Sequence, residues 1–277
     1  MTESVFESAE TAARWRANAE RRARFLAPAT ERMLDAAGVV AGARVLDLGT
    51  GTGDTALLAA QRVGPAGSVL ATDVSEAMLR AATEAVAAAG LTNVECQRQD
   101  ASALVGLEPE SFDAVIARFS LQFVPDLGAA LAGIRRVLKP GGRFGALVWA
   151  AAELNPFLSL SVAVARRTGR LRAPEAQVGR PFSLADAAAL AGAARGAGLE
   201  AEVEEIPLEV QARDTAGAME GIHNSPTTNT ILDALEAGER KAFESDLVAE
   251  IERYREPDGE GYRFPALALL LRGRKGA

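Results

Sequence analysis

The 277-residue sequence contains one cysteine, Cys96, and one histidine, His223. A single cysteine excludes an intrachain disulfide, and a single histidine excludes a metal site built from several histidines. The opening segment "MTESVFESAE" lacks the apolar core of a signal peptide, and no apolar run approaches the ~20 residues that cross a bilayer. We therefore expect a cytoplasmic protein without a bound metal.

Basic residues are outnumbered: 30 Lys and Arg stand against 37 Asp and Glu, for a net charge of -7. This balance argues against a general nucleic-acid binder, which would usually be basic. Aromatic residues make up only 5% of the chain. They therefore give no sign of a surface on which an aromatic substrate would stack. The expected partner is a small-molecule substrate, with no nucleic acid and no membrane insertion, and a homodimer is left open.

Short apolar runs alternate with helical stretches from residue 44 onward: "RVLDL", "SVLATD", "VECQR", "FDAVIA" and "RFGALVW". Such alternation predicts an α/β fold, a doubly wound sheet of parallel strands joined by crossover helices. Cys96 falls in the third run and is expected in the core. A capping box from Ser183 to Asp186 predicts a helix, and Pro207 suits an edge strand.

The first thirty-odd residues are expected to be helical, because Trp15, Ala19, Ala23 and Leu26 share one face of a 3.6-residue period. Pro28 should interrupt this helix, and Thr30 should cap a second one that ends at Gly38. We interpret residues 1–277 as a single domain with parts bounded as follows: lid helices over 1–38, a cofactor-binding half over 42–150, and substrate-cap insertions at 151–181 and 214–261.

The stretch "VLDLGTGTGD" places Gly49, Gly51 and Gly53 between an apolar strand and a helix, where bare backbone N–H groups can meet a ligand. The phosphate-loop pattern fails, because no Gly-Lys-Ser/Thr follows. The dinucleotide pattern G-x-G-x-x-G also fails, because Asp54 takes the place of the third glycine and would repel a pyrophosphate. The loop favours a ligand with little phosphate character.

Carboxylates stand at the ends of three predicted strands. Asp73 ends the second strand, where it can accept both ribose hydroxyls of a nucleoside. Asp100 follows the third strand, where it either meets an adenine amino group or caps the next segment, and Asp47 lies near the end of the first strand. Three carboxylates around a nucleoside favour a ligand that carries positive charge.

The segments "VLDLGTGTGD", "VLATDVSEAML", "RQDAS" and "RVLKPGGRF" together resemble, in order and spacing, the motifs of class I S-adenosylmethionine-dependent methyltransferases. Within that class they look most like the group around the ubiquinone/menaquinone C-methyltransferases (methyltransferase type 11). The resemblance covers about residues 42–149. It implies a Rossmann-like, seven-stranded sheet in the order 3-2-1-4-5-7-6 with strand 7 antiparallel, and S-adenosylmethionine as the cofactor.

The resemblance also implies roles for individual residues. The glycine loop would hold the methionine end of the cofactor, Asp73 the ribose, and the residues after the second and third strands the adenine, although core packing explains Met78 equally well. Residues beyond the fourth strand would line the methionyl half through their backbone. The expected cofactor-binding residues are Asp47, Gly49, Thr50, Gly51, Gly53, Asp73, Val74, Met78, Asp100, Ala101, Arg118 and Phe119.

Methyl transfer is an in-line displacement, for which alignment of the reactants can suffice without a dedicated base. Many relatives have a histidine pair after the fourth strand, whereas this chain has Gln122 and Phe123 there, so a histidine base carried over from them is in doubt. His223 is the catalytic candidate and is expected in a loop, with packing as its alternative role. The substrate candidates are Trp15, Gln122, Asn155 and His223.

The basic stripe of the N-terminal segment has two interpretations. It forms a solvated face, or it belongs to a lid in which Trp15 covers the cofactor and an arginine meets its carboxylate or an acidic substrate. The arginines concerned are Arg14, Arg16, Arg21, Arg22 and Arg24.

The sequence thus predicts S-adenosylmethionine-dependent methyl transfer to an oxygen, nitrogen or carbon atom of a small organic molecule. Two alternatives remain. One is an NAD-dependent oxidoreductase, and the other is a non-methylating S-adenosylmethionine-binding protein such as a pericyclase.

Overall fold

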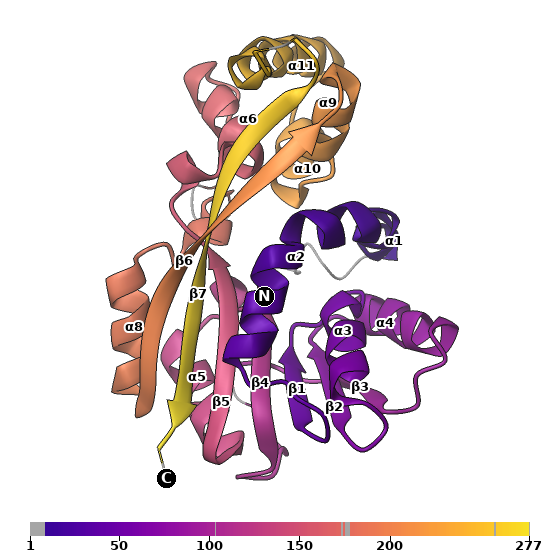
Figure 1. Ribbon diagram of the computed structural model, residues 1–277. Coiled ribbons are helices and arrows are strands. Elements are labelled where there is room, and N and C mark those ends of the chain that lie inside the picture. The colour runs from indigo at the N-terminus through magenta and orange to yellow at the C-terminus, as the bar shows by residue number, and fades with distance from the viewer. Residues whose placement is uncertain (1–8, 103, 173, 175–177, 258, 277) are drawn as a thin grey trace. The chain divides into compact units, whose positions relative to one another are not determined.

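The computed structural model describes residues 9–276 apart from 103, 173, 175–177 and 258. Seven strands form one sheet in the order β3-β2-β1-β4-β5-β7-β6, as the resemblance implied. The arrow of β7 runs opposite to those of β5 and β6 (Figure 1). The strands are β1 (Arg44–Leu48), β2 (Ser68–Asp73), β3 (Val94–Arg98), β4 (Phe112–Arg118), β5 (Leu138–Trp149), β6 (Leu199–Ala212) and β7 (Tyr262–Lys275).

Strands β1 to β5 pair in parallel, with β1 between β2 and β4. Their register aligns Val45 of β1 with Val69 of β2 and with Ala114 of β4. All these strands therefore end at one edge of the sheet, which brings together the loops after β1, β2, β3 and β4. The glycine loop, Asp73, Asp100 and Phe119 all lie at this edge.

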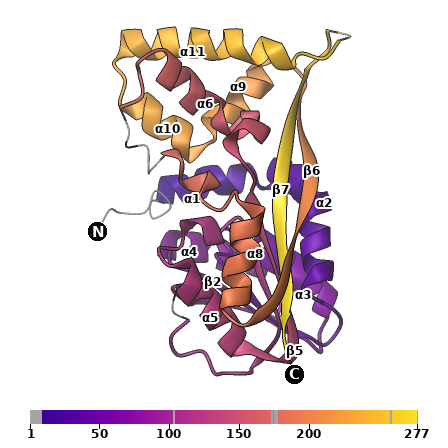
Figure 2. The same cartoon turned by 90° about the vertical axis from the view of Figure 1, so that its left-hand side faces the viewer.

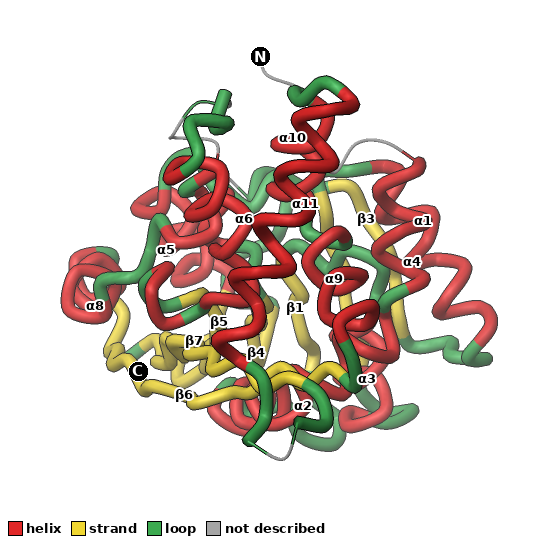
Figure 3. The backbone as a smooth tube through the Cα atoms, turned by 90° about the horizontal axis from the view of Figure 1, so that it is seen from above, coloured by secondary structure: helices red, strands yellow, loops and turns green. Residues whose placement is uncertain are grey.

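Helices cover both faces of the sheet (Figures 2 and 3). On one face lie α2, α3 and α4, and on the other α5 packs against α8, as right-handed crossovers require. The helices are α1 (Ala9–Ala17), α2 (Ala19–Ala36), α3 (Asp54–Val63), α4 (Glu76–Ala88), α5 (Leu127–Val137), α6 (Pro156–Arg167), α8 (Ala187–Gly196), α9 (Thr215–His223), α10 (Pro226–Asp233) and α11 (Ala237–Ile251). Short 3-10 turns are η1 (Leu121–Phe123), η2 (Ala152–Leu154), η3 (Arg180–Phe182) and η4 (Glu252–Tyr254).

The chain divides into two compact units. Unit 1 comprises Met1–Val148, Leu184–Ile206 and Ala268–Ala277, and its core includes the fully buried Val45, Leu46 and Leu48 of β1. Unit 2 comprises Trp149–Ser183 and Pro207–Leu267. Its helices α6 and α11 contact each other, and α11 buries Phe243, Leu247 and Ile251.

The N-terminal helices differ from the prediction. The break falls at Asn18, and α2 continues through Pro28, so that Thr30 is a buried residue inside the helix rather than its cap. An internal proline costs a helix about 3 kcal/mol. Leu26, Met33 and Leu34 on the same helix are buried, and each buried side chain of this size contributes roughly 1.5–3 kcal/mol. Packing on both sides of Pro28 therefore outweighs the lost hydrogen bond.

Two smaller expectations are also corrected. Asp186, not Ser183, caps α8, because its carboxylate accepts a hydrogen bond from the amide of Ala189. Cys96 is only partly buried, because β3 is an edge strand of the sheet. Pro207 does lie on the other edge strand, β6, as predicted.

Within the described part of the chain, no helix has the length and apolar character that a membrane span requires.

Candidate cofactor-binding site

The glycine loop connects β1 to α3, and all three of its glycines have positive φ: +69° at Gly49, +58° at Gly51 and +90° at Gly53. A side chain is strained in this left-handed region. The loop is fastened by two backbone hydrogen bonds, from Thr50 N to Thr72 O (2.8 Å) and from Gly53 N to Thr50 O (3.0 Å). This backbone conformation therefore requires glycine at all three positions.

Space is a second constraint at Gly49. A Cβ atom there would lie 2.4 Å from Cβ of Ser120, the residue after Phe119. Ser120 is fixed in turn, because its hydroxyl donates to the carbonyl oxygen of Leu48 at 2.6 Å. The segment after β4 thus packs directly on the glycine loop.

Asp73 ends β2 beside the glycine loop. One of its carboxylate oxygens accepts a hydrogen bond from Gly51 N and the other from Ser75 N, both at 2.9 Å. Burial raises the pKa of Asp73, although the backbone hydrogen bonds act in the opposite direction. Each carboxylate oxygen can accept a further bond, so this side chain can still receive two ligand hydroxyls.

Asp47 is 1% exposed in β1. Its Oδ2 accepts a hydrogen bond from the Thr50 hydroxyl at 2.8 Å, whereas its Oδ1 has no hydrogen-bond partner among the described residues. Burial raises the pKa of Asp47 to about 7. A buried acceptor without a donor is costly, and an ammonium group on a ligand would supply the donor.

The pKa of Asp47 predicts a pH dependence of folding. Between about pH 4 and pH 7 the folded chain binds a proton at Asp47 that the unfolded chain has released, so the free energy of unfolding falls as the pH rises. The slope from one group is at most about 1.4 kcal/mol per pH unit. Urea unfolding of the wild type and of Asp47→Asn at pH 5, 6 and 7 measures it. The variant should lose this component, and parallel pH profiles of the two proteins would contradict the assignment.

Asp54 begins α3 and forms ion pairs with two arginines. Its Oδ2 lies 2.6 Å from Arg22 Nη2 and 3.2 Å from Arg118 Nη2, and its Oδ1 accepts from the Thr52 hydroxyl. Burial alone would raise the pKa of Asp54, but the charges of Arg22 and Arg118 outweigh it and hold the pKa below its usual value. The negative charge that the sequence analysis assigned to the loop is thus compensated.

Arg118, which was expected to act through its backbone, places its side chain beside Asp54. That side chain is 9% exposed, and its guanidinium also donates to the Thr30 hydroxyl at 3.3 Å. Burial lowers the pKa of Arg118, and the charge of Asp54 opposes that shift. The next residue, Phe119, has φ of +55°, an uncommon value for a residue with a side chain.

Trp15 of α1 lies beside the glycine loop. Its ring carries the Arg22 guanidinium at 4.6 Å from the ring centroid, and its Nε1 is 3.7 Å from where a Cβ of Gly51 would be. Trp15 also packs on the buried cluster of Ala12, Ala77 and Met78. The structure therefore brings together the first helix and the loop, which the lid interpretation requires.

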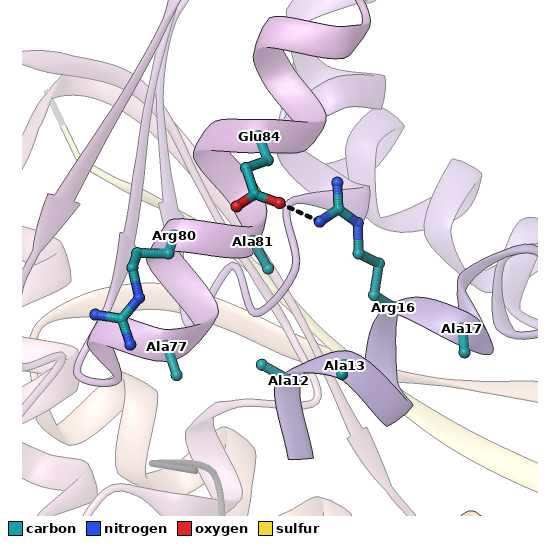
Figure 4. A pocket seen from close by; sticks show the side chains of 8 residues that line it. All are labelled: Ala12, Ala13, Arg16, Ala17, Ala77, Arg80, Ala81 and Glu84. Atoms are coloured by element: carbon teal, nitrogen blue, oxygen red, sulfur yellow. Dashed lines mark hydrogen bonds and ion pairs between the residues drawn. The ribbon is translucent and has the colours of Figure 1, made fainter. Parts of the chain in front are cut away.

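Helices α1 and α4 face each other mainly with small side chains (Figure 4). A cavity of about 490 Å³ lies between the two helices, and the ion pair of Arg16 with Glu84 stands at its border. The alanines that line it are Ala12, Ala13, Ala17, Ala77 and Ala81. Met78, expected to flank adenine, is 2% exposed and belongs to the packing of this region.

The residues expected at the adenine line an open cavity of about 470 Å³. It is formed by Val74, which is 43% exposed, with Arg98, Gln99 and Asp100. Asp100 is exposed, and its Oδ1 accepts hydrogen bonds from the amide (2.8 Å) and hydroxyl (2.5 Å) of Ser102. Ala101 follows in the same turn. Asp100 thus organises its own loop, and its other oxygen remains as an acceptor for a ligand.

Gln122, expected to contact the substrate, lies in η1 of unit 1 and is 3% exposed. Asn155 and His223 lie in unit 2. Asn155 is fully buried, and its amide bonds to backbone atoms of Ala150, Ala151 and Leu267, which fits a structural role. His223 ends α9 rather than lying in a loop, with Nε2 3.9 Å from Glu244 Oε1.

Sequence reasoning missed the ion pairs of Asp54 and the contact of Ser120 with Gly49. Their partners are 32 and more residues away along the chain, and no spacing pattern marks them. Across the described residues, no group of three or more His, Cys, Asp or Glu side chains is arranged to hold a metal ion.

Comparison with known proteins gives a matching family model, described as a methyltransferase domain, over residues 45–142. The chain is 40% identical over 124 residues to a ubiquinone/menaquinone biosynthesis C-methyltransferase, UbiE of Pasteurella multocida, covering 44% of this chain and 46% of that protein. It is 38% identical over 125 residues to the nocamycin O-methyltransferase of Saccharothrix syringae, covering 44% and 43%. The chain thus spans about half the length of these relatives, and the resemblance inferred from the motifs is confirmed.

Solved structures are similar in fold. The YcgJ protein from Bacillus subtilis matches with a TM-score of 0.59 at 21% identity, over 90% of this chain and 98% of that one. The [4+2]-cyclase SpnF matches with a TM-score of 0.56 at 22% identity, over 90% and 82%. The expected Rossmann-like fold is therefore confirmed over most of the chain.

Proposed function

We propose, on the premise that residues 45–142 form a methyltransferase domain, that this protein transfers a methyl group from S-adenosylmethionine to a small organic molecule. The observation that carries the proposal is the set of polar groups at one sheet edge. Asp73 offers acceptors to a ribose, Asp47 offers a buried acceptor to an ammonium group, and three bare glycines lie between them.

S-adenosylmethionine would supply an electrophilic methyl group bonded to a positively charged sulfur. The chain's own residues would hold S-adenosylmethionine and orient its methyl group. The glycine loop lets the amino-acid end approach the backbone, Asp73 fixes the ribose, and Asp100 and Ala101 meet the adenine. The buried carboxylates near the loop favour a cation over a neutral ligand of the same shape.

We also assign residues that would bind the methyl acceptor. Residues 151–181 and 214–261 supply the acceptor-binding surface, residues 1–38 the lid and residues 42–150 the cofactor site. Gln122 can orient an acceptor by hydrogen bonding but cannot take up a proton near neutral pH. His223 is the candidate base. Oxygen, nitrogen and carbon acceptors are all compatible with alignment as the main source of rate.

The test uses S-adenosylmethionine with a labelled methyl group and a panel of phenols, carboxylic acids, amines and acidic carbon compounds. Label in any acceptor, lost in Asp73→Asn, is the expected result. Binding of S-adenosylmethionine without transfer to any acceptor would favour the non-methylating alternative. Binding of NAD in its place would favour the oxidoreductase.

A further inference from the structure

We propose that Arg22 binds the carboxylate of the cofactor's amino-acid part, and that this contact distinguishes complete S-adenosylmethionine from forms without that carboxylate. The inference rests on the proposed function, because it takes S-adenosylmethionine as the ligand. It assigns a residue of α2, outside the matched residues 45–142, to the recognition of one chemical group.

Arg22 shares its anionic partner with a second arginine. The side chains of Arg22, Arg118 and Asp54 are 15%, 9% and 13% exposed, and the single carboxylate of Asp54 is paired with both guanidinium groups. A carboxylate on a bound ligand would give Arg22 a second anionic partner in a largely buried position.

The hydrogen bonds of Arg22 leave its Nε–H for a ligand carboxylate. Nη1 donates to Trp15 O at 2.8 Å, and Nη2 donates to Asp54 at 2.6 Å and to Thr52 at 3.3 Å. The Nε–H is buried and has no acceptor within the part of the chain that the structure describes. It can donate one charge-assisted hydrogen bond to a carboxylate, and such bonds are stronger than those between neutral groups.

Arg22 is also held in the right place. The Trp15 ring lies against its guanidinium at 4.6 Å, and the Trp15 Nε1 borders the glycine loop at Gly51. On the β1 side of the same loop, Asp47 Oδ1 is a buried acceptor without a donor. A buried donor and a buried acceptor beside one loop match the carboxylate and the ammonium of an α-amino acid.

The experiment is calorimetric titration of the full chain with S-adenosylmethionine and with decarboxylated S-adenosylmethionine, which keeps the amine and lacks the carboxylate. Arg22→Gln should weaken binding of S-adenosylmethionine by roughly 10- to 100-fold and binding of the decarboxylated form by less than about 3-fold. Arg21→Gln, an equal change of charge at the exposed neighbouring position of α2, should change neither affinity by more than about 2-fold.

Equal losses for the two ligands in Arg22→Gln would overturn the inference, because they would report a general disturbance of the site. If that variant fails to fold, Arg22→Lys decides, since it keeps the charge and loses the Nε–H donor. A loss confined to the ligand with the carboxylate supports the inference, and equal affinities or equal losses overturn it. Failure of the wild type to bind either ligand would instead refute the proposed function.

Discussion

Replacing Asp73 with alanine is expected to reduce the affinity for S-adenosylmethionine and S-adenosylhomocysteine by roughly 100-fold or more. In the proposed complex its carboxylate accepts two ribose hydroxyls, and each hydrogen bond to a charged group contributes about 1.5–3 kcal/mol. The variant also removes the acceptor for Gly51 N, which loosens the loop that contacts the ligand. Calorimetric titration with both ligands measures the effect.

Asp113→Ala is the matched control, because it removes a carboxylate at the start of β4, the opposite edge of the same sheet. There Asp113 bonds Arg44 N and Lys139 Nζ and should matter only for folding. A second variant, Asp73→Asn, keeps the shape and loses the charge. Wild-type affinity in Asp73→Ala, with the protein folded, would remove this residue from the site.

The largest expected effect on stability comes from Gly49→Ala, which should lower the free energy of unfolding by about 2–5 kcal/mol. Left-handed backbone costs a residue with a Cβ about 1–2 kcal/mol, and overpacking adds typically 1–3 kcal/mol. Here the new Cβ would lie 2.4 Å from Ser120 Cβ. Urea unfolding of the variant and the wild type at one pH gives the difference.

Gly90→Ala separates the two causes. Gly90 has a similar φ of +65° in the left-handed turn after α4, where Leu91 N donates to Val86 O, but a Cβ there would meet nothing within 4 Å. Only the backbone cost of about 1–2 kcal/mol therefore remains. Adding Ser120→Gly to Gly49→Ala should recover part of the loss, once the single Ser120→Gly variant is subtracted in a double-mutant cycle. Equal losses at Gly49 and Gly90 would show that the overlap relaxes without cost.

The strands could be predicted from the sequence because each combines an apolar run with a turn signal. The predicted runs at 44–48, 68–73 and 94–98 coincide with β1, β2 and β3. The glycine loop was equally visible, since positive φ leaves a local mark in the choice of residue. Sheet order came from the resemblance, which the matched family model and the similar structures confirm.

What sequence reasoning missed depends on contacts between distant segments. Asp54 looked like an isolated charge because its partners, Arg22 and Arg118, lie 32 and 64 residues away. Pro28 looked like a helix break because the local rule carries no information on the burial of Met33 and Leu34. His223 looked like a loop residue, although it closes the last turn of α9. In each case tertiary packing decided against the local signal.

The alanine-lined contact of α1 with α4 bears on how a ligand enters and leaves. Each alanine buries a single methyl group, worth roughly 0.8 kcal/mol when fully buried, so the helix of nine residues is held mainly by Trp15 and one surface ion pair. Local detachment of α1 therefore requires far less free energy than unfolding of the sheet. On the proposed function, we therefore expect a ligand at the glycine loop to be released by fraying of this one short helix, without any rearrangement of the core.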